Sequence, residues 1–179
     1  CPNTNDTGDN LAGRLNYIKH NFLDKREKNL PVIVKFSNDT RIEQIPYLLD
    51  LLFELGYDGV NFGNTSTNYA KRKGYINKSE HRLYDYFTTT FGGGVSGRPL
   101  KEDSLEIASR AVEYLNKGKP RQEFHVIRTG GIENYRDIEQ SEKAGISLNQ
   151  WFTGYWERFA KHGHNVYNNL YDELTHFSC

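Results

Sequence analysis

The sequence predicts an α/β fold built on a parallel sheet, and three observations lead to that prediction. Short runs rich in β-branched and aromatic residues alternate with longer segments whose apolar residues recur at helical spacing. Glycine follows several of the helical segments, where it commonly ends a helix. The order β-α-β-loop-α-β-α-β-α favours parallel strands joined by right-handed crossovers. Four such units form either half of an eight-stranded (β/α) barrel or a small, open, doubly wound sheet.

The strands are expected where short apolar runs end in polar or glycine-rich residues. The first run, PVIVKF, has the composition of a buried parallel strand, with Lys35 as its one charged member. The four expected strands cover residues 31–36, 57–62, 123–128 and 146–152.

The helices are expected where apolar residues share one face. Pro46 is compatible with a helix only near its first turn, so one helix should begin close to residue 41 and end before Gly56. Asp103 or Ser104 is expected to cap a second helix, and Asn134 a third, which Gly145 ends. The expected helices are 15–22, 41–55, 104–116, 134–144, and most of the chain from 155 to about 174.

Two segments are expected to lack regular structure. Residues 1–13 are rich in Asn, Asp, Gly and Thr, which is typical of a loop. Residues 69–97 form a long stretch with no clear periodicity, and such a stretch in a compact domain is usually a lid or a binding loop. The tract Lys71-Arg72-Lys73 within it is expected to be a solvated face.

Composition excludes several function classes. The 179 residues carry 23 basic and 23 acidic side chains, so the formal net charge is zero and a nucleic-acid partner is not expected. No apolar run approaches the length that crosses a bilayer. Two cysteines at opposite ends form no disulfide framework and, without a signal peptide, favour a reducing, cytoplasmic location. The chain has no Met and begins at Cys1, which indicates a missing or processed N-terminal part.

Polar or glycine-rich clusters follow the expected strands and the long loop. In parallel α/β folds, ligands bind beyond the carboxyl ends of the strands. The clusters are Asn64-Thr65, Ser96-Gly97, Gly130-Gly131 and Thr153-Gly154. Their common position predicts one binding site at that edge of the sheet.

Each cluster has a functional and a structural interpretation. Gly130-Gly131 followed by a helix start, together with Thr153 one unit later, fits a phosphate site; a lone Gly-Gly would be a tight turn. Asn64-Thr65 fits a planar polar ligand, or an Asx or ST turn. Lys35 either serves a ligand or extends to the rim of the sheet. A thiol such as Cys1 can act as a general base. The six histidines show no metal-ligand spacing, and no metal site is predicted.

Read together, these motifs resemble dihydroorotate dehydrogenase. Six segments occur in the order and approximate spacing of that family: CPNT (1–4), PVIVKFSND (31–39), DGVNFGNTST (58–67), GGVSGRPL (93–100), TGGI (129–132) and AGISLNQWFTG (144–154). The resemblance spans essentially the whole chain. It implies that residues 1–179 form a single domain, the C-terminal half of an FMN-binding (β/α)8 TIM barrel.

The resemblance implies a role for each matching position. Cys1 looks like the catalytic base that removes the C5 proton of dihydroorotate while hydride passes from C6 to FMN. Asn3 looks like an orotate ligand, and Asn64 and Thr65 like the pair that binds the pyrimidine. The cofactor-binding positions are Lys35 at the flavin ring, Ser96 and Gly97 beside the flavin, and Gly130, Gly131, Phe152 and Thr153 at the phosphate.

The sequence departs from the family pattern at several positions. The SGRPL and NTST segments are closer to the quinone-dependent, membrane-associated branch, whereas cysteine at the base position is typical of the soluble branch. Gly63 replaces a common threonine, Arg128 a small residue, and Asn5-Asp6 the usual Pro-Gly. The electron acceptor is therefore left as a quinone or a soluble molecule.

The predicted function is oxidation of dihydroorotate to orotate in pyrimidine biosynthesis, with FMN as cofactor. The missing N-terminal half of the barrel would be a partner in the site and could hold a peripheral membrane attachment; a homo-oligomer stays open. One alternative is another FMN-dependent barrel that acts on a related ring. A second is an inactive half-barrel fragment that needs a partner chain.

Overall fold

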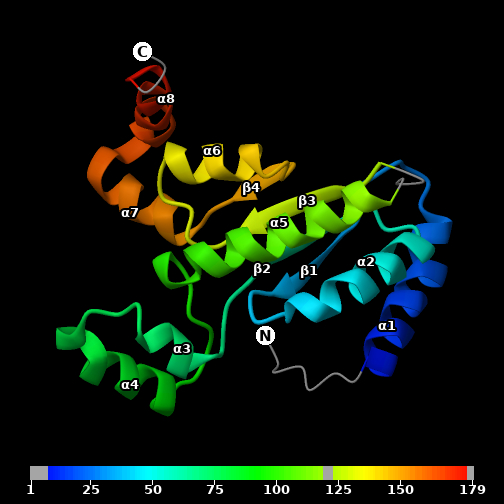
Figure 1. Cartoon of the computed structure of the whole chain (residues 1–179), viewed down its shortest axis with the longest axis horizontal. Helices are drawn as coiled ribbons and strands as arrows, with labels where there is room; N and C mark the ends of the chain where they lie inside the picture. Colours follow the sequence, from blue (N-terminus) through cyan, green and yellow to red (C-terminus); the bar gives the residue numbers. More distant parts are fainter. Residues whose placement is uncertain (1–7, 119–122, 177–179) are drawn as a thin grey trace.

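A four-stranded parallel sheet forms the centre of the computed structural model, which describes residues 8–118 and 123–176 (Figure 1). The strands lie side by side in chain order, and every pair of neighbours is parallel. All four predicted strands are present, and each begins two residues later than expected. Their bounds are β1 Ile33–Ser37, β2 Gly59–Asn64, β3 His125–Thr129 and β4 Leu148–Gln150.

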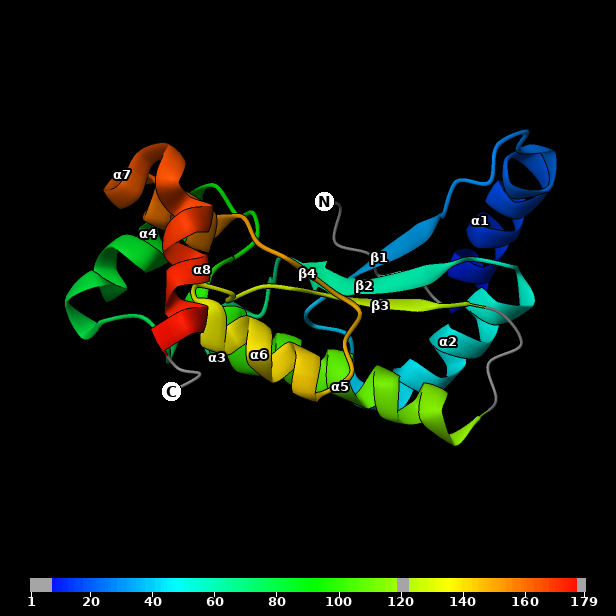
Figure 2. The ribbon, with the colours of Figure 1, turned by 90° about the horizontal axis from the view of Figure 1, so that it is seen from above.

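The helices that connect the strands lie on one side of the sheet. Figure 2 shows α2, α5 and α6 on the same side, while α1 lies near the ends where the strands begin. A doubly wound sheet carries helices on both faces and reverses its strand order, so this arrangement is that of a partial (β/α) barrel. The bounds of the helices are α1 Gly8–Asn21, α2 Ile45–Glu54, α3 Tyr69–Lys73, α4 His81–Thr90, α5 Lys101–Lys117, α6 Tyr135–Lys143, α7 Thr153–His162 and α8 Val166–His176.

Five short 3₁₀ turns lie next to these helices. One of them, η2 Ile42–Gln44, leads directly into α2, so the predicted helix over 41–55 is a 3₁₀ turn followed by an α-helix with Pro46 in its first turn. The other four are η1 Leu23–Lys25, η3 Lys78–Glu80, η4 Arg98–Leu100 and η5 Gly163–Asn165.

The hydrophobic core lies between the sheet and the helices α2 and α5. Strand residues Val60, Phe62 and Val126 are buried against it, and the rings of Phe36 and Phe62 stack with centroids 5.9 Å apart. The helices contribute the apolar faces expected from their periodicity: Ile45, Leu48, Leu49 and Leu52 from α2, and Ile107, Ala108, Ala111 and Val112 from α5. Burial of these side chains is the main force that holds the helices on this face.

Two predictions about irregular segments are wrong. Residues 8–13 belong to α1, whose Leu15 packs in the core, so tertiary contacts outweigh the local Gly and Asn composition. Residues 69–97 contain α3, η3 and α4 rather than one irregular loop. No residue of α4 is buried, so its apolar spacing is not fixed by a core contact.

The helix ends agree with the prediction in part. The Asn134 side chain accepts a hydrogen bond from the Asp137 N–H, as an N-cap does, and Gly56 and Gly145 have φ values of +74° and +75°. The prediction that Asp103 or Ser104 caps α5 is wrong, because Leu100 stands at its N-cap position. Within the described ranges, every helix is too short or too polar to cross a bilayer.

Candidate functional site

The uncovered face of the sheet carries a row of polar side chains. Register places Lys35 beside Asn61, and the alternation along each strand puts both on the face away from α2 and α5, together with Thr129 and Gln150. The Gln150 Oε1 atom accepts hydrogen bonds from Asn61 Nδ2 at 3.2 Å and from Thr129 Oγ1 at 3.1 Å. Thr129 Oγ1 also lies 2.9 Å from Asn61 Oδ1. These contacts place one polar group from each of β2, β3 and β4 within a single network.

Lys35 supplies the positive charge of this network. Its Nζ lies 3.5 Å from Gln150 Oε1, and the side chain is exposed. No carboxylate of the described residues forms an ion pair with it. An ammonium group that contacts only an amide oxygen keeps donors for a ligand on this face.

Asn38 joins the carboxyl ends of β2 and β3. Its side chain is 2% exposed, and its Nδ2 donates to the backbone oxygens of Asn64 at 2.9 Å and Thr129 at 3.3 Å. Its Oδ1 has no hydrogen-bond partner among the described residues. The predicted clusters at Asn64 and Gly130 therefore start from strand ends that a common side chain holds together.

The segment that follows β2 is fixed by hydrogen bonds to its neighbours. Ser66 forms an isolated antiparallel bridge with Val95, and the hydroxyl of Ser66 and the N–H of Thr67 donate to the Asp39 carboxylate. The Asp39 contacts anchor the Asn64-Thr65 pair to the end of β1. The bridge between Ser66 and Val95 brings the same pair beside the 92–97 segment. Sequence analysis identified neither Asp39 nor Val95 as a supporting residue.

Arg72 is the central side chain below this segment. It is 1% exposed, so the prediction that the tract 71–73 is a solvated face is wrong for Arg72. Its Nε donates to Ser66 Oγ at 2.8 Å, and its Nη1 lies 2.6 Å from an Asp103 carboxylate oxygen. Lys71 and Lys73 keep partly exposed side chains.

The hydroxyls of Ser96 and Thr153 meet at the ends of the loop and of β4. Ser96 Oγ and Thr153 Oγ1 are 3.0 Å apart and share a hydrogen bond. Gly97 has a φ of +78°, and a Cβ at this position would lie 2.9 Å from the Thr153 Cγ2. The close approach of these two segments therefore requires glycine.

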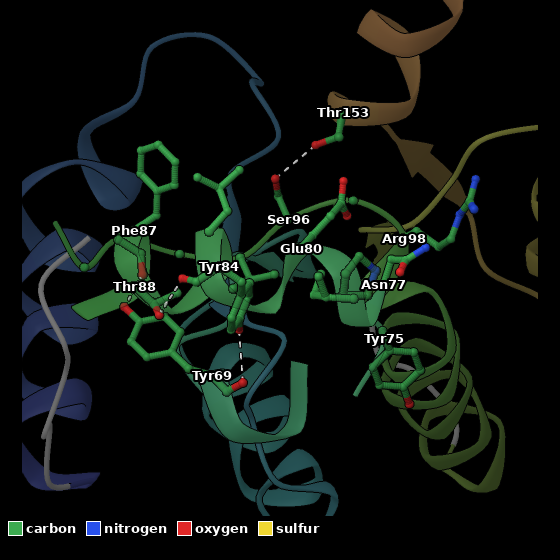
Figure 3. A pocket seen from close by; sticks show the side chains of 18 of the residues that line it. Tyr69, Tyr75, Asn77, Glu80, Tyr84, Phe87, Thr88, Ser96, Arg98 and Thr153 are labelled. Carbon is green, nitrogen blue, oxygen red and sulfur yellow. Dashed lines mark hydrogen bonds between the residues drawn. The ribbon is translucent and has the colours of Figure 1, made fainter. Parts of the chain in front are cut away.

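A groove of about 710 Å³ opens beside this pair of hydroxyls. Figure 3 shows Ser96 and Thr153 at one side of it, and aromatic side chains from the α3–α4 segment at the other. Burial raises the pKa of the Tyr84 phenol, whose hydroxyl donates to the Tyr69 backbone oxygen. The main aromatic residues of the lining are Tyr69, Tyr75, Tyr84 and Phe87.

Basic and acidic groups form ion pairs beside the glycine loop, the segment with Gly130 and Gly131 that follows β3. Glu133 accepts from Arg98 at 3.0 Å and from Lys101 at 2.8 Å. Burial alone would lower the pKa of the Lys101 ammonium, but hydrogen bonds to Glu133 and Asp137 outweigh it and the pKa is raised. Lys101 therefore keeps its positive charge close to the loop that follows β3.

The predicted site residues fall into three groups. Lys35 lies in the network of the uncovered face, Asn64 ends β2 and Thr65 follows it, and Gly130 and Gly131 follow directly on β3. A second set lines or adjoins the groove: Ser96, Gly97, Thr153 and Phe152, whose ring is 71% exposed. The predicted base and orotate ligand, Cys1 and Asn3, lie outside the described residues.

Sequence analysis missed three members of the polar network, namely Asn61, Thr129 and Gln150. Alternation along β2 could have identified Asn61, because Gly59, Asn61 and Gly63 share the face opposite Val60 and Phe62. Asn38 could not be identified in the same way, because its partners are the ends of two strands far along the chain.

The donor set fits an anionic group attached to a planar ring. Hydroxyls at Ser96 and Thr153, the backbone after β3 and the N-terminus of α7 are typical partners of a phosphate. The Lys35 ammonium and the amides of Asn61 and Gln150 suit a flat molecule with alternating donors and acceptors.

The chain matches the family described as "Dihydroorotate dehydrogenase" over residues 1–177. It is 36% identical over 129 residues to a dihydroorotate dehydrogenase (quinone) of Streptomyces avermitilis, a match that covers 72% of this chain and 32% of that protein. The corresponding protein of Aliivibrio fischeri is 25% identical over 162 residues, covering 90% of this chain and 44% of the relative. The chain thus spans between about a third and less than half of these relatives.

The chain is also similar to solved structures of dihydroorotate dehydrogenase. A ligand-free dihydroorotate dehydrogenase of Eimeria tenella is 27% identical and superposes with a TM-score of 0.59, covering 79% of this chain and 34% of that one. A second structure of the Eimeria tenella enzyme, in complex with ferulenol, covers 97% of this chain and 46% of its own with a TM-score of 0.69. At 23% identity, the second likeness shows the fold alone.

Proposed function

The chain belongs to the dihydroorotate dehydrogenase family, and on that premise we propose that its protein oxidises dihydroorotate to orotate in pyrimidine biosynthesis. The cofactor would be FMN, which would supply the redox chemistry of this oxidation and link the substrate to an electron acceptor. The observation that carries the proposal is the uncovered sheet face, where Lys35, Asn61, Thr129 and Gln150 form one network next to the carboxyl ends of the strands.

The chain offers two regions to the two ends of FMN. Lys35 would place its positive charge beside the flavin ring, where electron density increases on reduction. The phosphate would be held by the Gly130-Gly131 backbone, the Thr153 hydroxyl and the N-terminus of α7, with Phe152 beside it. Ser96 and Gly97 would contact the cofactor between these regions.

Asn64 and Thr65 would orient the pyrimidine ring together with Asn3. Asn38 and Asp39 support this role, because they hold the end of β2 and the segment after it in place. Orientation of the reacting ring is worth several kcal/mol in such reactions. Cys1 would take the proton from C5 of dihydroorotate as a general base.

The N-terminal half of the barrel would complete the site. In the described residues β1 pairs only with β2 and β4 only with β3, so each outer strand offers an edge on which a barrel could close. We propose a quinone as the electron acceptor, because the curated relatives reported above are quinone-type enzymes. A cytoplasmic location with peripheral membrane attachment through the N-terminal part belongs to the same proposal.

The test is flavin reduction in the full-length protein. The purified protein is expected to carry FMN, and dihydroorotate should bleach its flavin absorbance without an added acceptor. Dihydrouracil, offered as an alternative substrate, should not bleach it. Bleaching by dihydrouracil alone would favour another FMN-dependent barrel, and a protein without flavin would contradict the proposal.

A matched pair of lysine variants tests the assignment of the ring region. Lys35→Met should slow flavin reduction by dihydroorotate at least about tenfold, because a favourable charge interaction near the ring is lost. Lys28→Met changes an exposed lysine before β1, at the opposite end of the strand, and should leave the rate unchanged. Equal rates in both variants would remove Lys35 from the site.

A further inference from the structure

Arg128 lies below the glycine loop with its whole guanidinium buried. The residue is 0% exposed and projects from β3 toward the helices, in the row otherwise occupied by apolar side chains. Nε donates to Ser104 Oγ at 3.0 Å and Nη2 to the Lys101 oxygen at 3.0 Å. Nη1 donates to the Asp137 backbone oxygen at 3.0 Å and to Ser141 Oγ at 2.9 Å.

All four acceptors of Arg128 are neutral, and within the described ranges it forms no ion pair. Burial lowers the pKa of its guanidinium, and the nearby Asp137 charge acts in the opposite direction. Burying a cation without a carboxylate partner is costly. The presence of the Arg128 guanidinium in a row of apolar residues, despite this cost, indicates that it has a specific effect on the groups around it.

That effect concerns the single proton of the Ser104 hydroxyl. Ser104 Oγ lies 3.0 Å from the Lys101 oxygen and 2.7 Å from the Gly130 oxygen, but a hydroxyl donates one hydrogen bond. Arg128 already donates to the Lys101 oxygen, so that acceptor does not depend on Ser104. The Ser104 proton is therefore directed to Gly130.

The bond to Gly130 fixes the orientation of the peptide between two glycines. Gly130 and Gly131 have φ values of +122° and +70°, and a peptide flanked by glycines can rotate at little steric cost. In a trans peptide the C=O and the following N–H point in opposite directions. With the Gly130 C=O held against α5, the Gly131 N–H points away from α5, and no described residue accepts a hydrogen bond from it.

We propose that Arg128 is a positioning residue that acts through Ser104 to aim the Gly131 N–H at the phosphate of FMN. The inference rests on the proposed function, in which this loop holds the phosphate. It predicts that the Arg128–Ser104 pair selects the phosphorylated flavin over riboflavin. A merely structural role would weaken the binding of both flavins alike.

The test uses the full-length protein, stripped of flavin and titrated with FMN and with riboflavin. Ser104→Ala should weaken the affinity for FMN about tenfold, as expected for the loss of one hydrogen bond to a charged ligand. The affinity for riboflavin should stay within about twofold of the wild-type value. Ser141→Ala removes another hydroxyl that Arg128 contacts, but this hydroxyl does not touch the loop. Its ratio of FMN to riboflavin affinity should stay at the wild-type value.

Arg128→Lys provides a second variant, because it keeps the charge but replaces the planar fork, whose separate nitrogens contact Ser104 and Lys101, by a single ammonium. It should lower the ratio as Ser104→Ala does. If both variants keep the wild-type ratio of FMN to riboflavin affinity, the inference is wrong while the proposed function stands. A wild-type protein that does not prefer FMN to riboflavin would instead overturn the proposed function, and this inference with it.

Discussion

Two buried arginines support the two halves of the candidate site in different ways. Arg72, 1% exposed, lies under the segment that follows β2, and Arg128, 0% exposed, lies under the loop that follows β3. Arg72 contacts the carboxylates of Asp39 and Asp103 as well as Ser66 and the Pro99 oxygen. Among the described residues, Arg128 donates to hydroxyls and backbone oxygens only.

The difference separates two uses of a buried cation. Around Arg72 the charge is neutralised, and the ion pairs together with the hydrogen bond to Ser66 tie the segments after β1 and β2 and the start of α5 to one point. Around Arg128 the charge is not neutralised by contact, and the geometry of the guanidinium instead decides where neighbouring protons go. The first arrangement should matter most for stability and the second for ligand selection.

The largest effect is expected for Arg72→Met. Removing the cation leaves the carboxylates of Asp39 and Asp103 with Lys71 as their one remaining ion-pair partner among the described residues, and breaking a buried pair in this way costs about 3–5 kcal/mol. The free energy of unfolding, measured by urea denaturation of the full-length protein, should fall by that amount. A loss below about 1 kcal/mol would mean that Asp39 and Asp103 are not held by Arg72.

Arg128→Met is expected to cost less, about 2 kcal/mol, because its acceptors retain other donors. The Lys101 oxygen can still accept from Ser104, and the Asp137 oxygen already accepts from Ser141. The side chain of methionine also fills much of the volume. The same denaturation experiment measures the difference, and a loss equal to that of Arg72→Met would remove the proposed distinction.

Asp103→Asn should lower the free energy of unfolding at pH 7 by about 1–2 kcal/mol. Burial alone would raise the pKa of Asp103, but hydrogen bonds from Lys71 and Arg72 outweigh it, and the folded pKa is lowered from 3.8. The stabilisation by Asp103 is therefore fully present above its unfolded pKa and is lost as the pH falls through the folded value.

The stability gap between Asp103→Asn and the wild type should accordingly close below the ordinary carboxyl range. Unfolding measured from pH 7 down to about pH 2 would follow this closure. Glu106→Gln, an exposed change on the same helix, serves as the control and should show no such gap. A gap that persists unchanged in acid would show that the Asp103 charge does not stabilise the fold.

Much of the sheet could be predicted from the sequence, because its strands are short apolar runs that end at glycine or polar residues. The helices α2 and α5 followed from their apolar faces. The α3–α4 segment could not be predicted, since α4 has no buried residue and its pattern therefore reports no core contact. The helix predicted over 15–22 starts later than α1, because Gly and Asn at the start of α1 favour a loop locally.

The buried polar residues that support the site were harder to predict from the sequence. Arg128 was noticed only as a departure from the family pattern, and its partners Ser104 and Ser141 are 24 and 13 residues away. Arg72 lies between two lysines whose side chains are partly exposed, so composition alone suggests a solvated tract. Burial of a charge depends on partners that folding brings together, and residue spacing carries no information on them.

The smallest effect is expected for Lys73→Ala, at most about 0.5 kcal/mol in the free energy of unfolding. Lys73 is adjacent to Arg72 in the chain and also forms an ion pair, with Asp85 at 2.6 Å, but its side chain is 36% exposed and that of Asp85 is 51% exposed. Solvent and salt weaken such a pair, whereas they do not reach Arg72. The measurement is urea denaturation at low and high salt, where the small difference should vanish at high salt. A loss comparable to that of Arg72→Met would mean that charge in the tract, rather than burial of one arginine, holds the α3–α4 segment to the site.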